Sequence, residues 1–315
     1  MRKVAGITPV WNEEACVVFA LASLLPYVDF YVLVDSGSTD QTLPLVRHFF
    51  DKEIESGKLV ILEHDLPKGF DISIPKNAAI NVIREAGYDY MIRLDGDDVF
   101  YADGAKKTVE LVQEIPSDIT KYTVNHWELY QYKAKTTLDF LDAITQDLFG
   151  SNKTPDDPNF MCLRIPPAFD SRPETYPKRY EGAYGHARIY RVDGAVSKGR
   201  WHEETFGNPG DDIYYDREKV IGAGGYSDWI VHYGWARPLD KKMEKAKVWV
   251  GEGKEEEDIR VNRIHKEWVY LKKYNLDNQD YGDHCWPHKI IFPFDAHPEV
   301  VYARAGEVAE FLRTQ

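Results

Sequence analysis

The chain has 315 residues and a formal net charge of −13, with 43% hydrophobic and 29% charged residues. This length and apolar content suffice for one large α/β domain or a domain with a smaller lobe. The acidic balance argues against generic nucleic-acid binding, because contacts to phosphates need Lys and Arg. No stretch approaches the roughly 18 apolar residues of a transmembrane helix. The three dispersed cysteines predict a reducing, cytoplasmic location.

The first 95 residues alternate between apolar runs and amphipathic segments. Helices are predicted at 12–25, from the turn after Asp35 to about Phe50, and at 76–86. The apolar runs predict strands at 3–10, 30–35, 59–63 and 89–95. This alternation predicts a parallel sheet with helices on both faces. Ligands of such sheets bind at the carboxyl ends of the strands, so Asp35 and Asp95 are expected to share one crevice.

The pattern changes after about residue 120. Segments 122–130 and 186–192 predict antiparallel strands, and the Pro-, Asp- and Asn-rich stretch 150–182 between them predicts a long loop or lid. Residues 240–273 are highly charged and predicted helical. The sequence therefore predicts three parts, at 1–120, 121–239 and 240–315.

An acidic turn, Asp95-Gly96-Asp97-Asp98, follows the fourth predicted strand. Carboxylates this close repel one another unless a positive charge offsets them. A hard divalent cation with oxygen ligands, Mn²⁺ or Mg²⁺, is the usual solution, and it would bind substrate phosphates. A solvated acidic turn is the simpler alternative.

Three segments then combine in one order and spacing. Pro9-Val10-Trp11-Asn12-Glu13 ends the first strand, Val34-Asp35-Ser36-Gly37-Ser38-Thr39-Asp40-Gln41-Thr42 ends the second, and Leu94-Asp95-Gly96-Asp97-Asp98 ends the fourth. Together they resemble the GT-A glycosyltransferases of family 2, over about residues 4–105. Lys76-Asn77 stands where such proteins often have an Arg-Asn pair opening a helix.

The resemblance implies a fold and an activity. The expected fold is α/β of GT-A type: a Rossmann-like, mostly parallel sheet flanked by helices, a smaller antiparallel sheet and a helical C-terminal extension. The expected activity is transfer of a sugar from a nucleoside-diphosphate sugar, with a UDP-sugar favoured, to a glycan or other hydroxyl acceptor. Inversion at the anomeric carbon is implied by the resemblance alone.

The resemblance also implies roles for residues of the first half. Pro9 and Glu13 would lie against the nucleoside, and Asp35 would accept hydrogen bonds from the base or ribose. Asp95 would face the ribose or the metal. Lys76 would assist the phosphates as a point charge.

The candidate metal ligands and the candidate catalytic base come from both halves of the chain. Asp97 would bind the cation, and His232 is a candidate further ligand, with a buried structural histidine as the alternative. The element Trp201-His202-Glu203-Glu204 resembles the short segment that follows the acceptor region in relatives. Glu203 is the predicted base for the acceptor hydroxyl, with Glu204 and Asp211 as alternatives.

Two other functions fit parts of the pattern. Asp95-Gly96-Asp97-Asp98-Val99 also satisfies the motif of haloacid-dehalogenase-type phosphatases, in which Asp95 would be a phosphorylated nucleophile. That family normally places its nucleophile on the first strand, whereas three strand–helix units come first here. A carbohydrate- or nucleotide-binding protein without turnover is the non-enzymatic alternative.

Overall fold

The computed structural model describes residues 1–64, 73–101, 103–115, 117, 121–131, 136–145, 161–164, 185–198, 205–207, 230–235, 241, 289–291 and 298–315. The chain divides into two compact units. Unit 1 comprises Met1–Asn125 and Gly185–Ile230, and unit 2 comprises His126–Tyr184 and Val231–Gln315. The three-part division expected from the sequence stays a prediction.

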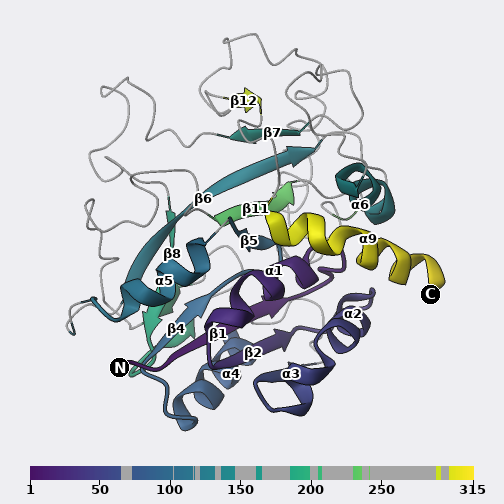
Figure 1. The fold of residues 1–315 in the computed structure, drawn as a ribbon. Helices are drawn as coiled ribbons and strands as arrows, with labels where there is room; N and C mark the ends of the chain where they lie inside the picture. Colours follow the sequence, from purple (N-terminus) through teal and green to yellow (C-terminus); the bar gives the residue numbers. More distant parts are fainter. Residues whose placement is uncertain are drawn as a thin grey trace, which may run out of the picture. The chain divides into compact units, whose positions relative to one another are not determined.

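Unit 1 is built on a parallel sheet whose strands lie in the order β4–β1–β2–β3 (Figure 1). These strands are β1 (Val4–Val10), β2 (Phe30–Asp35), β3 (Leu59–Glu63) and β4 (Tyr90–Arg93). All four strand predictions are confirmed, and the order places β1 between β2 and β4 with parallel pairing on both sides.

Antiparallel strands continue this sheet beyond β4. Strand β8 (Gly185–Arg191) pairs with β4, and the first residues of β6 (Lys121–Gln131) pair with β8. Both strands agree with the predicted antiparallel segments. Unit 1 also holds β5 (Asp98–Phe100) and the antiparallel pair β9 (Val196–Lys198) and β10 (Thr205–Gly207).

The core of unit 1 follows from the alternation of side chains along the strands. Ala5 and Ile7 of β1 and Val32 and Val34 of β2 share one buried cluster with apolar residues of helix α4 (Ser73–Glu85). Successive side chains of a strand point to opposite faces, so this cluster marks the face that α4 covers. The opposite face carries Tyr31.

The remaining helices of unit 1 are α1 (Val17–Leu24), the 3₁₀ turn η1 (Leu25–Tyr27), α2 (Thr42–Phe49), α3 (Asp51–Glu55) and α5 (Gly104–Val112). The helix expected from residue 12 begins only at Val17. Residues 11–16 instead form a loop whose backbone N–H groups bind side chains of a neighbouring loop.

Unit 2 contains a small antiparallel sheet and a helix pair. The second part of β6 pairs with β7 (Met161–Arg164), which pairs with β12 (Lys289–Ile291). Helix α6 (Thr137–Thr145) packs against the C-terminal helix α9 (Glu299–Thr314) (Figure 1), and Arg313 pairs with Asp142.

One prediction from the sequence is wrong for unit 2. Strand β7 lies inside 150–182, which was expected to be a loop, so that prediction is wrong for residues 161–164. The predicted helical segment 240–273 lies outside the described residues, apart from helical Lys241. Within the described part of the chain, no helix combines the length and apolar character needed to cross a bilayer.

Gly6 tests the packing of the sheet. A Cβ on Gly6 would lie 2.2 Å from Cε2 of the fully buried Tyr31 ring. We expect Gly6→Ala to lower the free energy of unfolding by about 1–3 kcal/mol, because the ring has no room to move. Urea unfolding followed by circular dichroism measures it.

Gly306→Ala is the contrasting variant, because its nearest neighbour, Thr145 Cγ2, would lie 3.8 Å away. This helical substitution should raise stability by about 0.5–1 kcal/mol. A Gly6→Ala protein as stable as the wild type would contradict the packing described for Tyr31.

Candidate functional site

The carboxyl ends of β1, β2 and β4 form one edge of the parallel sheet. The chain runs from β1 through β2 to β3 on one side and then returns to β4 on the other side of β1. Such a reversal of strand order creates a crevice at the carboxyl ends, where ligands of α/β sheets bind. Glu13 follows β1 and Asp95 follows β4, so the predicted motifs of these two strands meet at this crevice.

The acidic turn after β4 packs directly against the segment after β1. Leu94 N–H donates to Ile7 C=O at 3.0 Å, which extends the contact between the two strands. A Cβ on Gly96 would lie 2.8 Å from both Glu13 Cγ and Val10 Cγ1. Only glycine allows this approach, and the turn therefore rests on the Glu13 side chain.

Three carboxylates gather in this turn. Asp97 and Asp98 are 3% and 0% exposed, while the Asp95 side chain keeps 28% of its surface. The turn is closed by Asp98 N–H, which donates to Asp95 C=O at 2.9 Å. Buried carboxylates need compensating charge or hydrogen bonds.

Arginine supplies that charge within the chain. Arg188, on β8 and 4% exposed, places one terminal nitrogen 2.8 Å from Asp95 Oδ2 and the other 2.6 Å from Asp98 Oδ2. Arg93 Nε lies 3.0 Å from Asp95 Oδ1. Neither arginine belongs to the motifs from which site residues were predicted. The available signal for Arg188 was a charged residue between Ala187 and Ile189 in a predicted strand.

Nearby positively charged side chains determine the direction in which the pKa of Asp95 is shifted. Burial disfavours its charged form, but the neighbouring Arg93, Arg188 and Lys76 outweigh that effect and hold the pKa of Asp95 well below its ordinary value. For Arg188, burial likewise opposes the charged form, and the attraction of Asp98 and Asp95 more than offsets it, which raises its pKa. The pair is therefore a stable ion pair.

Lys76 lies in the first turns of α4 and is 3% exposed. Its neighbour Asn77 fixes the helix start to β9, because the Asn77 amide exchanges two hydrogen bonds of 2.9 and 2.8 Å with the backbone of Ser197. Lys76 is also close enough to Asp95 to help lower the pKa of that carboxyl. Its contact with a phosphate stays a prediction.

Hydrogen bonds connect the loops after β1 and β2. Asn12 has a left-handed backbone with φ 54°, its N–H donates to Ser38 Oγ at 2.9 Å, and its Oδ1 accepts from Thr39 N–H at 2.8 Å. Asn tolerates this conformation better than most residues with a side chain. The residue thereby fixes where Glu13 enters the crevice.

Thr42 continues this connection between the two loops. Its hydroxyl accepts Glu13 N–H at 2.7 Å and donates to Asp40 Oδ1 at 2.5 Å. Asp40 also accepts Thr42 N–H at 2.9 Å and Glu14 N–H at 3.2 Å. Burial raises the pKa of Asp40, and the bonds from Thr42 offset only part of that shift.

The polar loop before α2 contains Ser38, Thr39 and Asp40, and none of them occupies the N-cap position of the helix. The N-cap position of α2 is Gln41, which makes no side-chain capping bond. Asp40 accepts the N–H of Thr42, the first residue of α2, and Ser38 and Asp40 also accept N–H groups of the neighbouring loop after β1.

Asp35 and Pro9 lie at the ends of β2 and β1. The Asp35 carboxylate accepts Gly37 N–H at 3.0 Å and Ser38 N–H at 3.0 Å, so it shapes its own loop. Burial raises the pKa of Asp35, against the effect of the bonds from Ser38 and Gly37. Pro9 is half-buried and pairs in register with Val34. It lies beyond the β1 residues that pair with β4, where a missing N–H is tolerated.

The other predicted site residues are His232 and Glu203. His232 is a half-buried residue of β11 (Ile230–Trp235) in unit 2, and its role as a ligand stays a prediction. Glu203 and its alternatives Glu204 and Asp211 lie outside the described residues.

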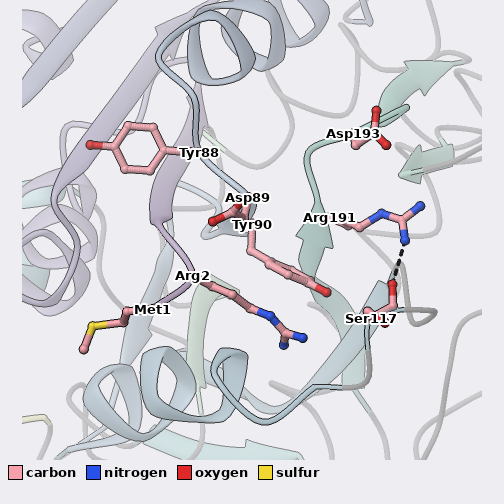
Figure 2. Close-up of a pocket in the computed structure, with 8 residues that line it drawn as sticks. All are labelled: Met1, Arg2, Tyr88, Asp89, Tyr90, Ser117, Arg191 and Asp193. Carbon is pink, nitrogen blue, oxygen red and sulfur yellow. Dashed lines mark hydrogen bonds between the residues drawn. The ribbon is translucent and has the colours of Figure 1, made fainter.

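A cavity of about 390 Å³ lies at the other end of the sheet, where β4 begins (Figure 2). Its charged groups hold chain segments together: Arg191 donates to Ser117 C=O at 2.8 Å, and Arg2 donates to Val112 C=O at 2.7 Å. Arg2 also lies over the Tyr90 ring. This cavity is separate from the acidic turn, which follows the opposite end of β4.

The family model for glycosyl transferase family 2 matches residues 7–171, just over half of the chain. The chain belongs to glycosyl transferase family 2. Together with the mostly parallel sheet, its flanking helices, the small antiparallel sheet and the C-terminal helix, this membership confirms the GT-A fold expected from the motifs. The matched segment contains the loops after β1, β2 and β4 that form the crevice of this family 2 protein.

Solved structures resemble parts of this family 2 chain. Glucosyl-3-phosphoglycerate synthase from Mycobacterium tuberculosis, in complex with Mn²⁺, uridine diphosphate and phosphoglyceric acid, is 17% identical over 40% of this chain and 43% of its own, with a TM-score of 0.30. Its complex with Mn²⁺ and UDP-glucose is 19% identical over 40% of this chain and 44% of its own, also with a TM-score of 0.30. The match thus spans less than half of that enzyme.

TarS from S. aureus, residues 1–349, is 14% identical over 85% of this chain and 71% of its own, with a TM-score of 0.34. A comparison with curated proteins finds no match. The family assignment therefore rests on the family model.

Thr42 tests the connection between the two loops. Thr42→Val keeps the shape of this buried side chain but leaves Glu13 N–H without its acceptor. An unsatisfied buried donor costs about 1–3 kcal/mol, so the free energy of unfolding should fall by that amount in urea titrations. Thr42→Ser keeps the hydroxyl and should lose less. Equal stability of the Val and Ser variants would show that the hydroxyl does not hold Glu13.

Proposed function

We propose that this protein transfers a sugar from a nucleoside-diphosphate sugar to an acceptor hydroxyl. The observation that carries the proposal is the buried acidic turn Asp95–Asp98 beside Glu13, at the carboxyl edge of the sheet of a family 2 member. A nucleotide sugar presents a base, a ribose, a diphosphate and a sugar. This edge offers carboxylates for the hydroxyl groups, and it would hold a cation for the phosphates.

Donor binding is assigned to the first half of the chain. Pro9 and Glu13 would contact the nucleoside, and Asp95 would face the ribose or the cation. Asp35 accepts two backbone N–H groups and would offer its remaining acceptor capacity to the base or ribose. Lys76 would bring positive charge to the diphosphate. A UDP-sugar is the favoured donor.

The acidic turn fits a hard divalent cation, Mn²⁺ or Mg²⁺. Its donors are carboxylate oxygens, the preferred ligands of such ions, and they are concentrated at a buried turn. Asp97 would hold the cation, with His232 as a proposed further ligand, and the ion would supply positive charge to the departing diphosphate. Asp95 and Asp98 already contact Arg188.

The acceptor side is assigned to the second half. Glu203 would take the proton of the acceptor hydroxyl as the hydroxyl oxygen attacks the anomeric carbon and the nucleoside diphosphate leaves. A single displacement of this kind inverts the anomeric centre. The acceptor would be a glycan or another hydroxyl compound, and a cytoplasmic location stays a prediction.

The phosphatase alternative requires Asp95 as a nucleophile. Both Asp95 oxygens contact arginine nitrogens, at 3.0 Å from Arg93 and 2.8 Å from Arg188. These contacts stabilise the carboxylate and reduce its nucleophilicity. Together with family membership, they favour sugar transfer over phosphoryl chemistry at Asp95.

Nucleotide binding tests the proposed donor class. In calorimetry against UDP, GDP, CDP and dTDP, we expect one nucleoside diphosphate to bind with Mn²⁺ and to lose binding in EDTA. Asp97→Asn should reduce this binding about 100-fold or more, because it removes the negative charge with which Asp97 would bind the cation. Asp103→Asn, at an exposed acid of unit 1, is the matched control and should bind like the wild type.

A failure of all four nucleotides to bind, combined with hydrolysis of a generic phosphate ester, would support the phosphatase alternative. Binding without any donor hydrolysis or transfer would support a non-catalytic binding protein. Full activity of Asp97→Asn would show that the metal assignment is wrong.

The base is tested separately from donor binding. Glu203→Gln should leave nucleotide affinity within about twofold and lower the transfer rate about 100-fold or more, because general base catalysis typically contributes a factor of this size. Glu204→Gln and Asp211→Asn are the parallel variants. Unchanged turnover in Glu203→Gln, with loss in one of the other two, would move the base to that residue.

A further inference from the structure

Arg188 already occupies two carboxylates of the acidic turn. Its two terminal nitrogens lie 2.8 Å from Asp95 Oδ2 and 2.6 Å from Asp98 Oδ2. The guanidinium group is planar and fork-shaped, which suits it to hold two carboxylates at once. The two terminal nitrogens of the guanidinium group therefore bridge the first and the last acid of the turn.

This contact is shielded from water. The side chains of Arg188 and Asp98 are 5% and 0% exposed, so solvent screens their attraction far less than at the surface. Arg93 adds a second guanidinium at Asp95, and Lys76 is close enough to stabilise the Asp95 charge. The charges of Asp95 and Asp98 are thus compensated by the chain's own cationic side chains.

A free divalent cation would have to compete with these groups. An ion that bridged Asp95 Oδ2 and Asp98 Oδ2 would need the oxygens that Arg188 now contacts, and any ion at the turn would meet the repulsion of that buried positive charge. A bound diphosphate changes the balance, because it adds negative charge and oxygen ligands next to the turn.

We propose that Arg188 is a positioning residue that keeps Asp95 and Asp98 from binding a free divalent cation, so that the cation binds together with the donor diphosphate. The inference rests on the proposed function, because it assigns order to the binding of the donor and its cation. In this role Arg188 contacts the acidic turn and does not contact the reacting atoms.

The role of Arg188 predicts an unusual result: removing it should strengthen the binding of the free ion. Titration of the nucleotide-free protein with Mn²⁺, followed by electron paramagnetic resonance, measures this affinity. Arg188→Gln should bind Mn²⁺ about tenfold tighter than the wild type, because charge and number of carboxylate ligands set cation affinity. With UDP present, the same variant should lose the nucleotide-dependent gain in Mn²⁺ affinity.

Two further variants make the test specific. Arg188→Lys keeps the charge but has no fork, so its Mn²⁺ affinity should lie between those of the wild type and Arg188→Gln. Arg191→Gln removes an arginine of the same strand that bonds to Ser117 C=O at the other end of the sheet, and it should match the wild type. Circular dichroism checks that each variant is folded.

The outcomes separate the inference from the proposed function. A folded Arg188→Gln that binds free Mn²⁺ no tighter than the wild type overturns the role of Arg188, since a purely structural residue would give equal or weaker binding. If Arg188→Gln does not fold, an unchanged affinity in Arg188→Lys overturns it. If no nucleoside diphosphate binds the wild type, the proposed function fails, while the ranking of free Mn²⁺ affinities still decides whether Arg188 competes with the ion.

Discussion

The ion pair between Arg188 and the carboxylates of Asp95 and Asp98 is the interaction on which the candidate site depends. Three acids within four residues would repel one another if they were buried without compensation. A hydrogen bond of 2.8 Å to Asp95 and an ion-pair contact of 2.6 Å to Asp98 supply that compensation for two of the acids from β8, a strand about 90 residues further along the chain. The antiparallel pairing of β8 with β4 brings this charge to the turn. The charge balance of the site therefore depends on the pairing of these two strands.

A second constraint fixes the other side of the crevice. The loops after β1 and β2 share hydrogen bonds through Asn12, Thr42 and Asp40, and the backbone of Asn12 adopts φ 54° to make them. Gly96 then lets the acidic turn approach Glu13 closely. Rigid loops on a rigid sheet are what a site needs if it must hold a donor in one orientation.

Sequence reasoning succeeded where the signal was local. Apolar runs and their alternation with helices gave the four parallel strands, and three short motifs gave the family. It failed where contacts between distant segments decide the outcome. Residues 12–16 were expected to be helical, because their acids resemble a helix start, but N–H groups of this segment bind Ser38, Thr42 and Asp40 instead. Strand β7 was missed because its Pro- and Asp-rich surroundings suggested a loop.

The sequence by itself determined that acids end three parallel strands and that these acids belong at one edge of a sheet, because strand periodicity and motif spacing are properties of short segments. Only the tertiary structure decided how those acids are held. It placed the arginine of β8 between Asp95 and Asp98 and turned Asp35 and Asp40 toward neighbouring N–H groups. A buried charge is stable only beside its partner, and the partner is set by strand pairing across the whole chain.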